Sequence, residues 1–205
     1  MTRVVLASRN AHKIEEMARI LDDAGLHVEV VGIDAFDGVV DVPEVAETEA
    51  TFEGNALLKA RAVCAATGVP AVADDSGLCV DALNGMPGIL SARWAGGHGD
   101  DAANLRLVLD QLSDTPDTRR GAAFVCAAAV VLPDGTERAV EGSVDGSIIR
   151  EPRGDGGFGY DPIFVPTGYA LTFAQIPAAE KDAMSHRGRA LQQLAPVLRD
   201  LLATG

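Results

Sequence analysis

Residues 121–132 form a long apolar run without an internal breaker, and Pro133-Asp134-Gly135 follows it directly. A Pro-Asp-Gly turn between this run and residues 136–144 is typical of a β-hairpin. The two strands of such a hairpin pair antiparallel. If the same sheet also contains strands that are connected through helices, it has both parallel and antiparallel pairs. The expected fold is therefore α/β or α+β with a mixed sheet.

Strand and helix patterns alternate along the rest of the chain. Residues 34–50 are acidic and lack a clear pattern, so they predict a loop with at most a short strand. The predicted elements are a strand at 3–7, a helix through 14–21, a helix from Thr51 to Gly68, a buried strand at 69–73, a helix through 105–112, the hairpin, a short strand at 163–165 and a helix through 191–201 that Pro196 should kink or break locally.

Size and charge narrow the class of protein. A chain of 205 residues with 47% apolar residues suits one globular domain, which a cleft can divide into two lobes. Its 17 Lys and Arg against 30 Asp and Glu give a net charge of −13, which repels a nucleic-acid backbone. We therefore expect no nucleic-acid partner. A small phosphorylated ligand is still allowed, because a metal ion or a few clustered cations reverse the field locally.

Cysteine usage and the N-terminus predict a soluble, cytoplasmic protein. Cys64, Cys79 and Cys126 are odd in number and form no C-x-x-C pair, which suits buried thiols in a reducing compartment. The apolar run at residues 4–7 is too short for a signal peptide or a membrane span. We expect no membrane partner.

Asp74 and Asp75 follow the predicted strand 69–73 and are expected at its end. Neighbouring side chains of a strand point to opposite faces, so at most one of the two aspartates faces a given site. Carboxylates suit Mg²⁺, which takes one or two of them and keeps the rest of its shell for water and phosphate. The alternative is a turn in which both aspartates bond the backbone.

Residues 8–13, Ser-Arg-Asn-Ala-His-Lys, gather two cations, an amide and a hydroxyl before a helix. The N–H groups at a helix N-terminus favour an anion, and these side chains suit a triphosphate. The segment lacks the glycines and the G-K-[ST] ending of a Walker loop. The alternative is a solvated helix start that these residues cap.

Two further groups lie toward the C-terminus. Residues 158–161 follow three glycines within 154–157, and such a loop lets an aromatic ring stack on a flat base. Lys181 and residues 185–187 gather hydrogen-bond donors before the last helix. The alternatives are a tight turn whose aromatic rings fill the core, and a Ser185 helix cap followed by exposed charges.

Motifs of other catalytic classes are missing. The four histidines show no zinc-ligand spacing, no G-x-S-x-G segment is present, and no G-x-G-x-x-G follows the first predicted strand. The sequence therefore disfavours a structural zinc site, a serine nucleophile of that class and dinucleotide binding.

Six segments, taken together and in order along the chain, identify a protein family more specifically than any one of these motifs does. They are VLASRNAHK at 5–13, TFEGNALLKA at 51–60, ADDSGL at 73–78, PGILSAR at 87–93, GFGYDP at 157–162 and SHRG at 185–188. Together they closely resemble the motif series of the inosine triphosphate pyrophosphatase family, over residue 4 to about residue 195.

The resemblance implies an elongated α/β fold in which helices flank a long mixed β-sheet. It implies a single domain of residues 1–205, with two lobes around a central substrate cleft. It implies a homodimer. It also implies Mg²⁺-dependent hydrolysis of ITP, dITP and XTP between the α- and β-phosphates, which gives the nucleoside monophosphate and pyrophosphate.

The family's site residues carry over position by position. Asp75 would be both general base and metal ligand, and Ser76 would touch the substrate. Glu47 matches the second metal ligand best, but the family usually has two adjacent acids there, and Glu44 is a rival. Arg9 replaces a usual glycine and either adds a phosphate contact or lies in solvent. The residues implied to bind substrate are Ser8, Arg9, Asn10, Ala11, His12 and Lys13 for the triphosphate, and Phe158, Gly159, Tyr160, Asp161, Lys181, His186 and Arg187 for the nucleobase.

Substrate choice follows from these donors. Hypoxanthine and xanthine present an acceptor at O6 where adenine presents an amino group, so Lys181, His186 and Arg187 should favour the oxo bases. Guanine shares O6, and its exclusion must come from another contact. Two other functions stay open: a Maf-like pyrophosphatase of pyrimidine or modified nucleotides, and a non-catalytic nucleotide sensor that acts through a dimer interface.

Overall fold

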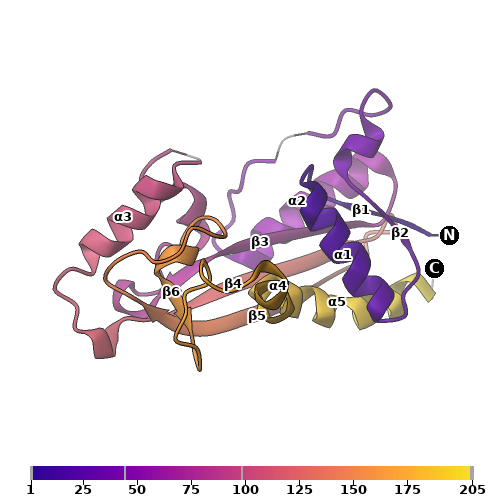
Figure 1. Cartoon of the computed structure of the whole chain (residues 1–205). Helices are drawn as coiled ribbons and strands as arrows, with labels where there is room; N and C mark the ends of the chain where they lie inside the picture. Colours follow the sequence, from indigo (N-terminus) through magenta and orange to yellow (C-terminus); the bar gives the residue numbers. More distant parts are fainter. Residues whose placement is uncertain (1, 44, 98, 204–205) are drawn as a thin grey trace. The chain divides into compact units, whose positions relative to one another are not determined.

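The computed structural model describes residues 2–43, 45–97 and 99–203 (Figure 1). Within them, helices and strands follow one another largely in the predicted order. The elements are β1 (Arg3–Leu6), α1 (Ala11–Asp23), β2 (Glu29–Val31), α2 (Phe52–Thr67), β3 (Ala71–Val80), α3 (Asp101–Gln111), β4 (Gly121–Val131), β5 (Glu137–Ile148), β6 (Phe164–Pro166), α4 (Ala178–Met184) and α5 (His186–Ala203), with short 3₁₀ helices such as Gly88–Arg93 between them.

The strands form one six-stranded sheet in the order β2-β1-β3-β4-β5-β6. Strand β1 is parallel to both β2 and β3, with Val5 opposite Ala71 in the second pair. Strand β5 is antiparallel to β6, with Ser147 opposite Val165. The sheet is therefore mixed, and the predicted α/β fold with helices flanking a mixed sheet is confirmed.

The chain divides into two compact units. Unit 1 consists of Met1–Asp75, Cys126–Gly142 and Arg187–Gly205, and unit 2 of Ser76–Val125 and Ser143–His186. The division falls within β3, β4 and β5. The predicted central cleft stays a prediction.

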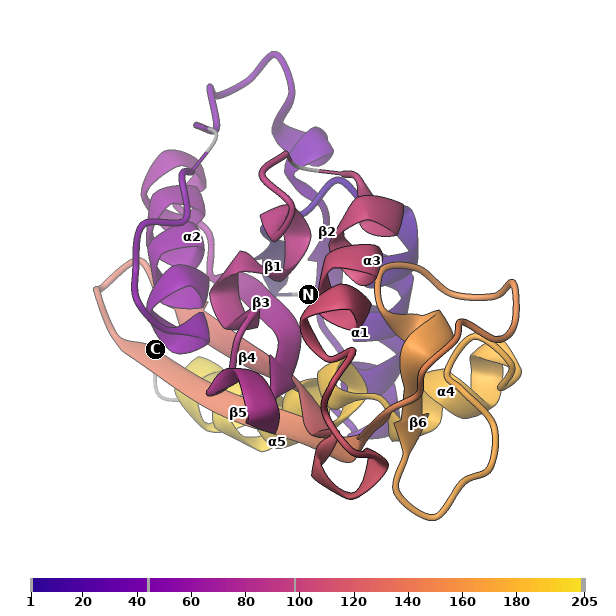
Figure 2. The ribbon, with the colours of Figure 1, turned by 90° about the vertical axis from the view of Figure 1, so that its left-hand side faces the viewer.

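Strand alternation builds the core of unit 1. Val4 and Leu6 of β1 belong to a buried cluster with residues of α1 and α5, whereas Val5 clusters with Ala60 and Val63 of α2. Successive strand residues point to opposite faces. Helices α1 and α5 therefore cover one face of the unit 1 strands and α2 covers the other, as Figure 2 shows for α1 and α2.

Aromatic rings fill the core of unit 2. The ring of Phe124 on β4 lies 4.7 Å from that of Phe164 on β6, edge to face, and 5.8 Å from that of Phe173. Val108 and Leu112, from α3 and its C-terminal end, belong to the same cluster. This confirms the predicted apolar face of that helix. Buried aromatic pairs of this geometry add about 0.5–1.5 kcal/mol beyond the area that they bury.

Two predicted element bounds are wrong. Strand β3 runs on to Val80, so Asp74 and Asp75 lie inside it and not at its end. Residues 34–50, predicted as a loop with at most a short strand, hold no strand in their described part; β2 precedes them and a 3₁₀ helix covers Ile33–Phe36. Strand β5 continues beyond residue 144 to Ile148 because it pairs with β6 there.

Helix α5 continues through Pro196 to Ala203. None of the described helices has the length and apolar character needed to cross a membrane.

Candidate active site

Asp74 lies in unit 1 between two cations from different helices. Its side chain is 7% exposed. Lys13 of α1 places Nζ 3.1 Å from Asp74 Oδ2, and Arg187 of α5 places Nη2 2.8 Å from the same oxygen. Arg187 also lies 3.5 Å from Glu16 through Nη1. One buried carboxylate therefore holds a lysine and an arginine that are 174 positions apart in the sequence.

Charge outweighs burial at Asp74. Burial alone would raise the pKa of this carboxyl, but the charges of Lys13, Arg187 and Lys59 hold the pKa well below its usual value. Burial lowers the pKa of Arg187, but the negative charges of Asp74 and Glu16 raise it by more, so the net pKa is raised. Both Asp74 and Arg187 are therefore held in their charged forms.

Asp75 belongs to a second cluster of unit 1, formed with α2. Asn55 Nδ2 donates to Asp75 Oδ2 at 3.1 Å. The Lys59 ammonium lies 3.5 Å from Asp75 Oδ1 and 2.8 Å from Glu47 Oε1. Asn55 Oδ1 also accepts the backbone N–H of Glu49 at 2.9 Å, which ties the acidic segment to α2.

The electrostatics of this second cluster differ from those at Asp74. Burial raises the pKa of Asp75 and the nearby Glu47 charge adds to the rise, while Lys59 opposes it. Burial lowers the pKa of Lys59, but two carboxylates share its ammonium, and the net pKa is raised. The single positive charge of Lys59 is therefore shared by the carboxylates of Glu47 and Asp75, and it only partly offsets the repulsion between them.

The donor set around Lys59 fits Mg²⁺. Asp75 and Glu47 are oxygen donors that already share one positive charge, and Mg²⁺ usually takes one or two protein carboxylates. Within the described residues, no three His, Cys, Asp or Glu side chains gather as a larger metal cluster. Glu44, the rival ligand in the sequence, lies outside the described residues.

The segment at residues 8–13 begins α1 in unit 1. Asn10 caps the helix, because its Oδ1 accepts the N–H groups of His12 and Lys13 at 3.0 and 3.4 Å. Ser8 Oγ accepts the N–H of Asn10 at 3.1 Å. Ala11 and His12 are exposed in the first turn. The cap that the sequence offered as the alternative is thus present.

Arg9 neither lies alone in solvent nor joins the Asp74 cluster. Its guanidinium forms two hydrogen bonds of 2.8 and 3.0 Å with the carboxylate of Asp37. Both side chains are exposed, so this ion pair is screened by solvent.

The nucleobase residues implied by the resemblance lie mostly in unit 2. Asp161 Oδ2 accepts the N–H of Phe158 at 2.8 Å and the ammonium of Lys181 at 2.5 Å. That ammonium lies 5.0 Å from the centroid of the Phe158 ring, which is 74% exposed. The ring of His186 stacks on Phe124 at 5.0 Å.

The other implied residues are arranged differently. Tyr160 is buried, and its hydroxyl donates to the carbonyl of Ser91 at 2.8 Å. Burial, and then the charge of Asp101, raise the pKa of Tyr160. Ser76 is half-buried in β3. Arg187, implied with the nucleobase donors, contacts Asp74 in unit 1 instead.

Asn55 and Lys59 were not singled out from the sequence. Both lie on α2, four residues apart, and therefore on one face of the helix that Thr51 caps. Thr51 Oγ1 accepts the N–H of Gly54 at 3.0 Å. The sequence signal that could have identified them is an amide and an ammonium four residues apart on a predicted helix that follows an acidic segment.

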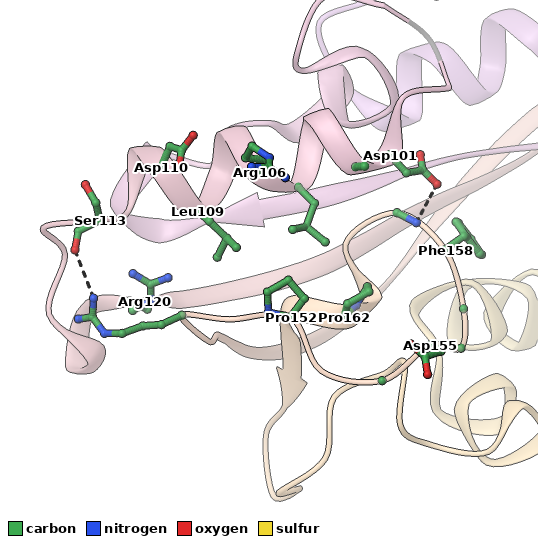
Figure 3. Close-up of a pocket in the computed structure, with 17 residues that line it drawn as sticks. Asp101, Arg106, Leu109, Asp110, Ser113, Arg120, Pro152, Asp155, Phe158 and Pro162 are labelled. Carbon is green, nitrogen blue, oxygen red and sulfur yellow. Dashed lines mark hydrogen bonds between the residues drawn. The ribbon is translucent and has the colours of Figure 1, made fainter.

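A cavity of about 870 Å³ lies in unit 2 between α3 and residues 150–162 (Figure 3). Its walls include Leu105, Leu109, Pro152 and Pro162, with the buried Arg120 among the lining residues. Asp161, Lys181 and His186 do not line it. The Arg120 guanidinium donates to three backbone carbonyls, those of Leu112, Ile148 and Ile149, which assigns it a structural role.

A family model described as the Ham1 family matches residues 4–197. The chain belongs to the Ham1 family. Its Ham1 relatives include a dITP/XTP pyrophosphatase of Streptomyces coelicolor, 60% identical over 98% of this chain and 100% of the relative. A dITP/XTP pyrophosphatase of Nocardia farcinica is 62% identical over 98% of this chain and 97% of the relative.

Solved structures of similar chains share the fold. A crystal structure of the nucleoside-triphosphatase, or dITP/XTP pyrophosphatase, of Mycobacterium abscessus matches with a TM-score of 0.81 and 57% identity, over 96% of this chain and 100% of that one. A HAM1 protein from Coxiella burnetii matches with a TM-score of 0.88 and 42% identity, over 98% and 100%. The resemblance drawn from the six segments is therefore confirmed.

Proposed function

We propose that this chain is a nucleoside triphosphate pyrophosphatase that hydrolyses non-canonical purine nucleoside triphosphates, such as dITP, ITP and XTP, to the monophosphate and pyrophosphate. One observation carries the proposal: the chain is about 60% identical, over essentially its full length, to curated dITP/XTP pyrophosphatases. The reaction is hydrolysis of an acid anhydride.

Lys13 and Arg187 are the cations that we assign to the triphosphate. An acidic chain repels a polyphosphate unless cations neutralise it at the point of contact. Asp74 fixes the positions of both cations, and the three groups together carry one positive charge. The ion pair to Asp74 supports placing Arg187 with the phosphates and not with the base.

The start of α1 supplies further donors for the phosphates. Asn10 uses its Oδ1 as the helix cap, which leaves its amide nitrogen to donate. Ser8, Ala11 and His12 surround the positive end of the helix. Arg9 makes a weaker candidate, because Asp37 already neutralises it.

Asp75 is our proposed general base, and Asp75 and Glu47 would hold Mg²⁺. The ionised carboxylate of Asp75 can accept a proton from an attacking water. Asn55 orients the carboxylate through Oδ2. When bound, Mg²⁺ would neutralise charge on the phosphates and lower the pKa of water. The contact that Glu47 and Asp75 share through Lys59 supports Glu47 as the second ligand.

Residues of unit 2 are our proposed nucleobase determinants. Lys181 and His186 are donors suited to the O6 acceptor of an oxo purine, and the exposed Phe158 ring offers a stacking surface. Adenine would leave such donors unpaired, which makes a polar pocket reject it. We place Ser76, Gly159, Tyr160 and Asp161 in the same substrate-binding set.

A hydrolysis panel over dITP, XTP, ITP, GTP and ATP with Mg²⁺ tests the proposal. We expect the first three to give monophosphate and pyrophosphate, the last two to react far more slowly, and omission of Mg²⁺ to abolish turnover. Asp75→Asn should leave almost no turnover, whereas Glu29→Gln, on the exposed ion pair with Arg3, should match the unmodified chain.

Three results would contradict the proposal. Orthophosphate as the first product would rule out cleavage between the α- and β-phosphates. Preferential turnover of pyrimidine or other modified nucleotides would indicate a Maf-like pyrophosphatase. Stoichiometric ITP binding without turnover would indicate a nucleotide sensor.

A further inference from the structure

A hydrogen bond joins α3 to the glycine-rich loop of unit 2, and the proposed function makes no use of it. The N–H of Gly159 donates to Asp101 Oδ2 at 2.9 Å, across 58 positions in the sequence. Figure 3 shows Asp101 at the start of α3 directed toward the loop backbone. Asp101 also lines the cavity under α3.

The neighbouring peptide unit of the loop is held in the same way. The N–H of Phe158 donates to Asp161 Oδ2 at 2.8 Å. The two peptide planes that flank the Phe158 Cα are therefore each fixed by a carboxylate, one from the loop's own turn and one from α3. Because these planes define φ and ψ, they set the direction of the Cα–Cβ bond from which the ring projects.

Neither packing nor backbone stiffness would hold the ring instead. Phe158 is 74% exposed, and the ring contact described for it is the Lys181 ammonium at 5.0 Å. Gly157 and Gly159, on either side, have φ of +71° and +60°. Glycine loses more conformational freedom on folding than any other residue, so this segment needs external restraint to keep one conformation.

We infer that Asp101 is a positioning residue for nucleobase recognition, which acts by fixing the Phe158 ring through the Gly159 N–H. The inference rests on the proposed function, because it takes Phe158 as the stacking surface for the base. Asp101 does not touch the substrate in this account. Its removal should weaken contacts to the base and leave contacts to the phosphates unchanged.

The test compares Asp101→Ala with Asp101→Asn, whose amide oxygen can accept the same N–H. With dITP as substrate, Asp101→Ala should raise KM about tenfold at nearly unchanged kcat, as expected for a lost hydrogen bond to a charged acceptor, and Asp101→Asn should recover most of the loss. Inhibition by inosine monophosphate should weaken to a similar extent. Inhibition by inorganic triphosphate, which has no base, should not change.

Asp110→Ala is the matched control, because Asp110 is an exposed carboxylate of the same helix that also lines the cavity. Trp94, whose indole N–H donates to Gln111 at the end of α3, reports by its fluorescence whether the helix stays folded. We expect both Asp101 variants and Asp110→Ala to keep the unmodified spectrum.

Two outcomes would overturn the inference. One is an Asp101→Ala enzyme with unchanged KM and inosine monophosphate inhibition. The other is an equal loss of inosine monophosphate and inorganic triphosphate binding, which would indicate a general structural role. Failure of the proposed function would look different, because the unmodified chain itself would then not hydrolyse dITP.

Discussion

Adjacent aspartates in β3 have different electrostatic surroundings. Asp74 faces two cations and keeps a pKa well below its usual value, whereas Asp75 shares one ammonium with Glu47 and has a raised pKa. The difference arises from strand alternation, which places the two side chains on opposite faces. Asp74 thus holds two cations in place, and Asp75 is the residue that we propose as the proton acceptor.

Replacing Asp74 by Asn should destabilise the chain. The amide keeps the size of the side chain but leaves Lys13 and Arg187 without their shared counter-charge, and breaking a buried ion pair costs about 3–5 kcal/mol. We expect a value at the lower end, because Lys13 is partly exposed. Urea unfolding gives the change in free energy.

Asp37→Asn is the control for this substitution. Asp37 also pairs with an arginine, but at an exposed site, so its loss should leave the urea midpoint unchanged. Equal midpoints for both variants would contradict the role of Asp74 as a buried counter-charge.

At the scale of elements, α2 positions the second cluster. The helix begins after Thr51 and ends before Gly68, which has a φ of +67°. Its inner face buries Ala56 and Ala60, so Asn55, one position earlier, is brought beside Asp75 by the packing of the helix. The position of a site residue here depends on the register of a whole helix.

Thr51→Ala should lower the free energy of unfolding by about 1 kcal/mol, because the N–H of Gly54 loses its capping partner. Thr51→Ser keeps a hydroxyl and should recover most of the loss. Thermal or urea unfolding of the two variants measures both effects. A Ser variant as unstable as the Ala variant would show that the methyl group, and not the cap, matters.

Local signals predicted the elements better than they predicted the contacts. The cap at Thr51, the turn at Pro133-Asp134-Gly135 and the apolar face of α3 were all readable, because each depends on residues close in sequence. The length of β3 was not, since Asp, Ser and Gly are poor strand formers and the cations that accommodate its charges come from other elements.

The same limit applies to the candidate site. The segment at 8–13 and the two aspartates could be picked out by composition alone. Lys59 and the place of Arg187 could not, because their partners lie 16 and 113 positions away in sequence. The resemblance to a family implied roles for residues, and the structure shows the carboxylate to which each cation is bound.

The whole chain carries a net charge of −13, and the proposed site gathers a few of its 17 cations. We propose that the chain forms a homodimer, as the family resemblance implies, and that it does not bind polymeric nucleic acid. Light scattering should give twice the 21.3 kDa chain mass. A single-stranded oligonucleotide should show no mobility shift at physiological salt. A monomer mass would contradict the homodimer, and a clear mobility shift would contradict the absence of nucleic-acid binding.

Strand β3 imposes a length requirement that the loops do not share. Because Asp74 and Asp75 point to opposite faces, deleting one residue upstream within the strand would bring Asp75 to the position of Asp74 and Ser76 to the position of Asp75. Inserting one residue would bring Ala73 to the position that faces Lys13 and Arg187. In either case one of the two carboxylates is lost from its position and the strand's remaining side chains change faces, so we expect the yield of folded protein to fall for single-residue indels in this segment.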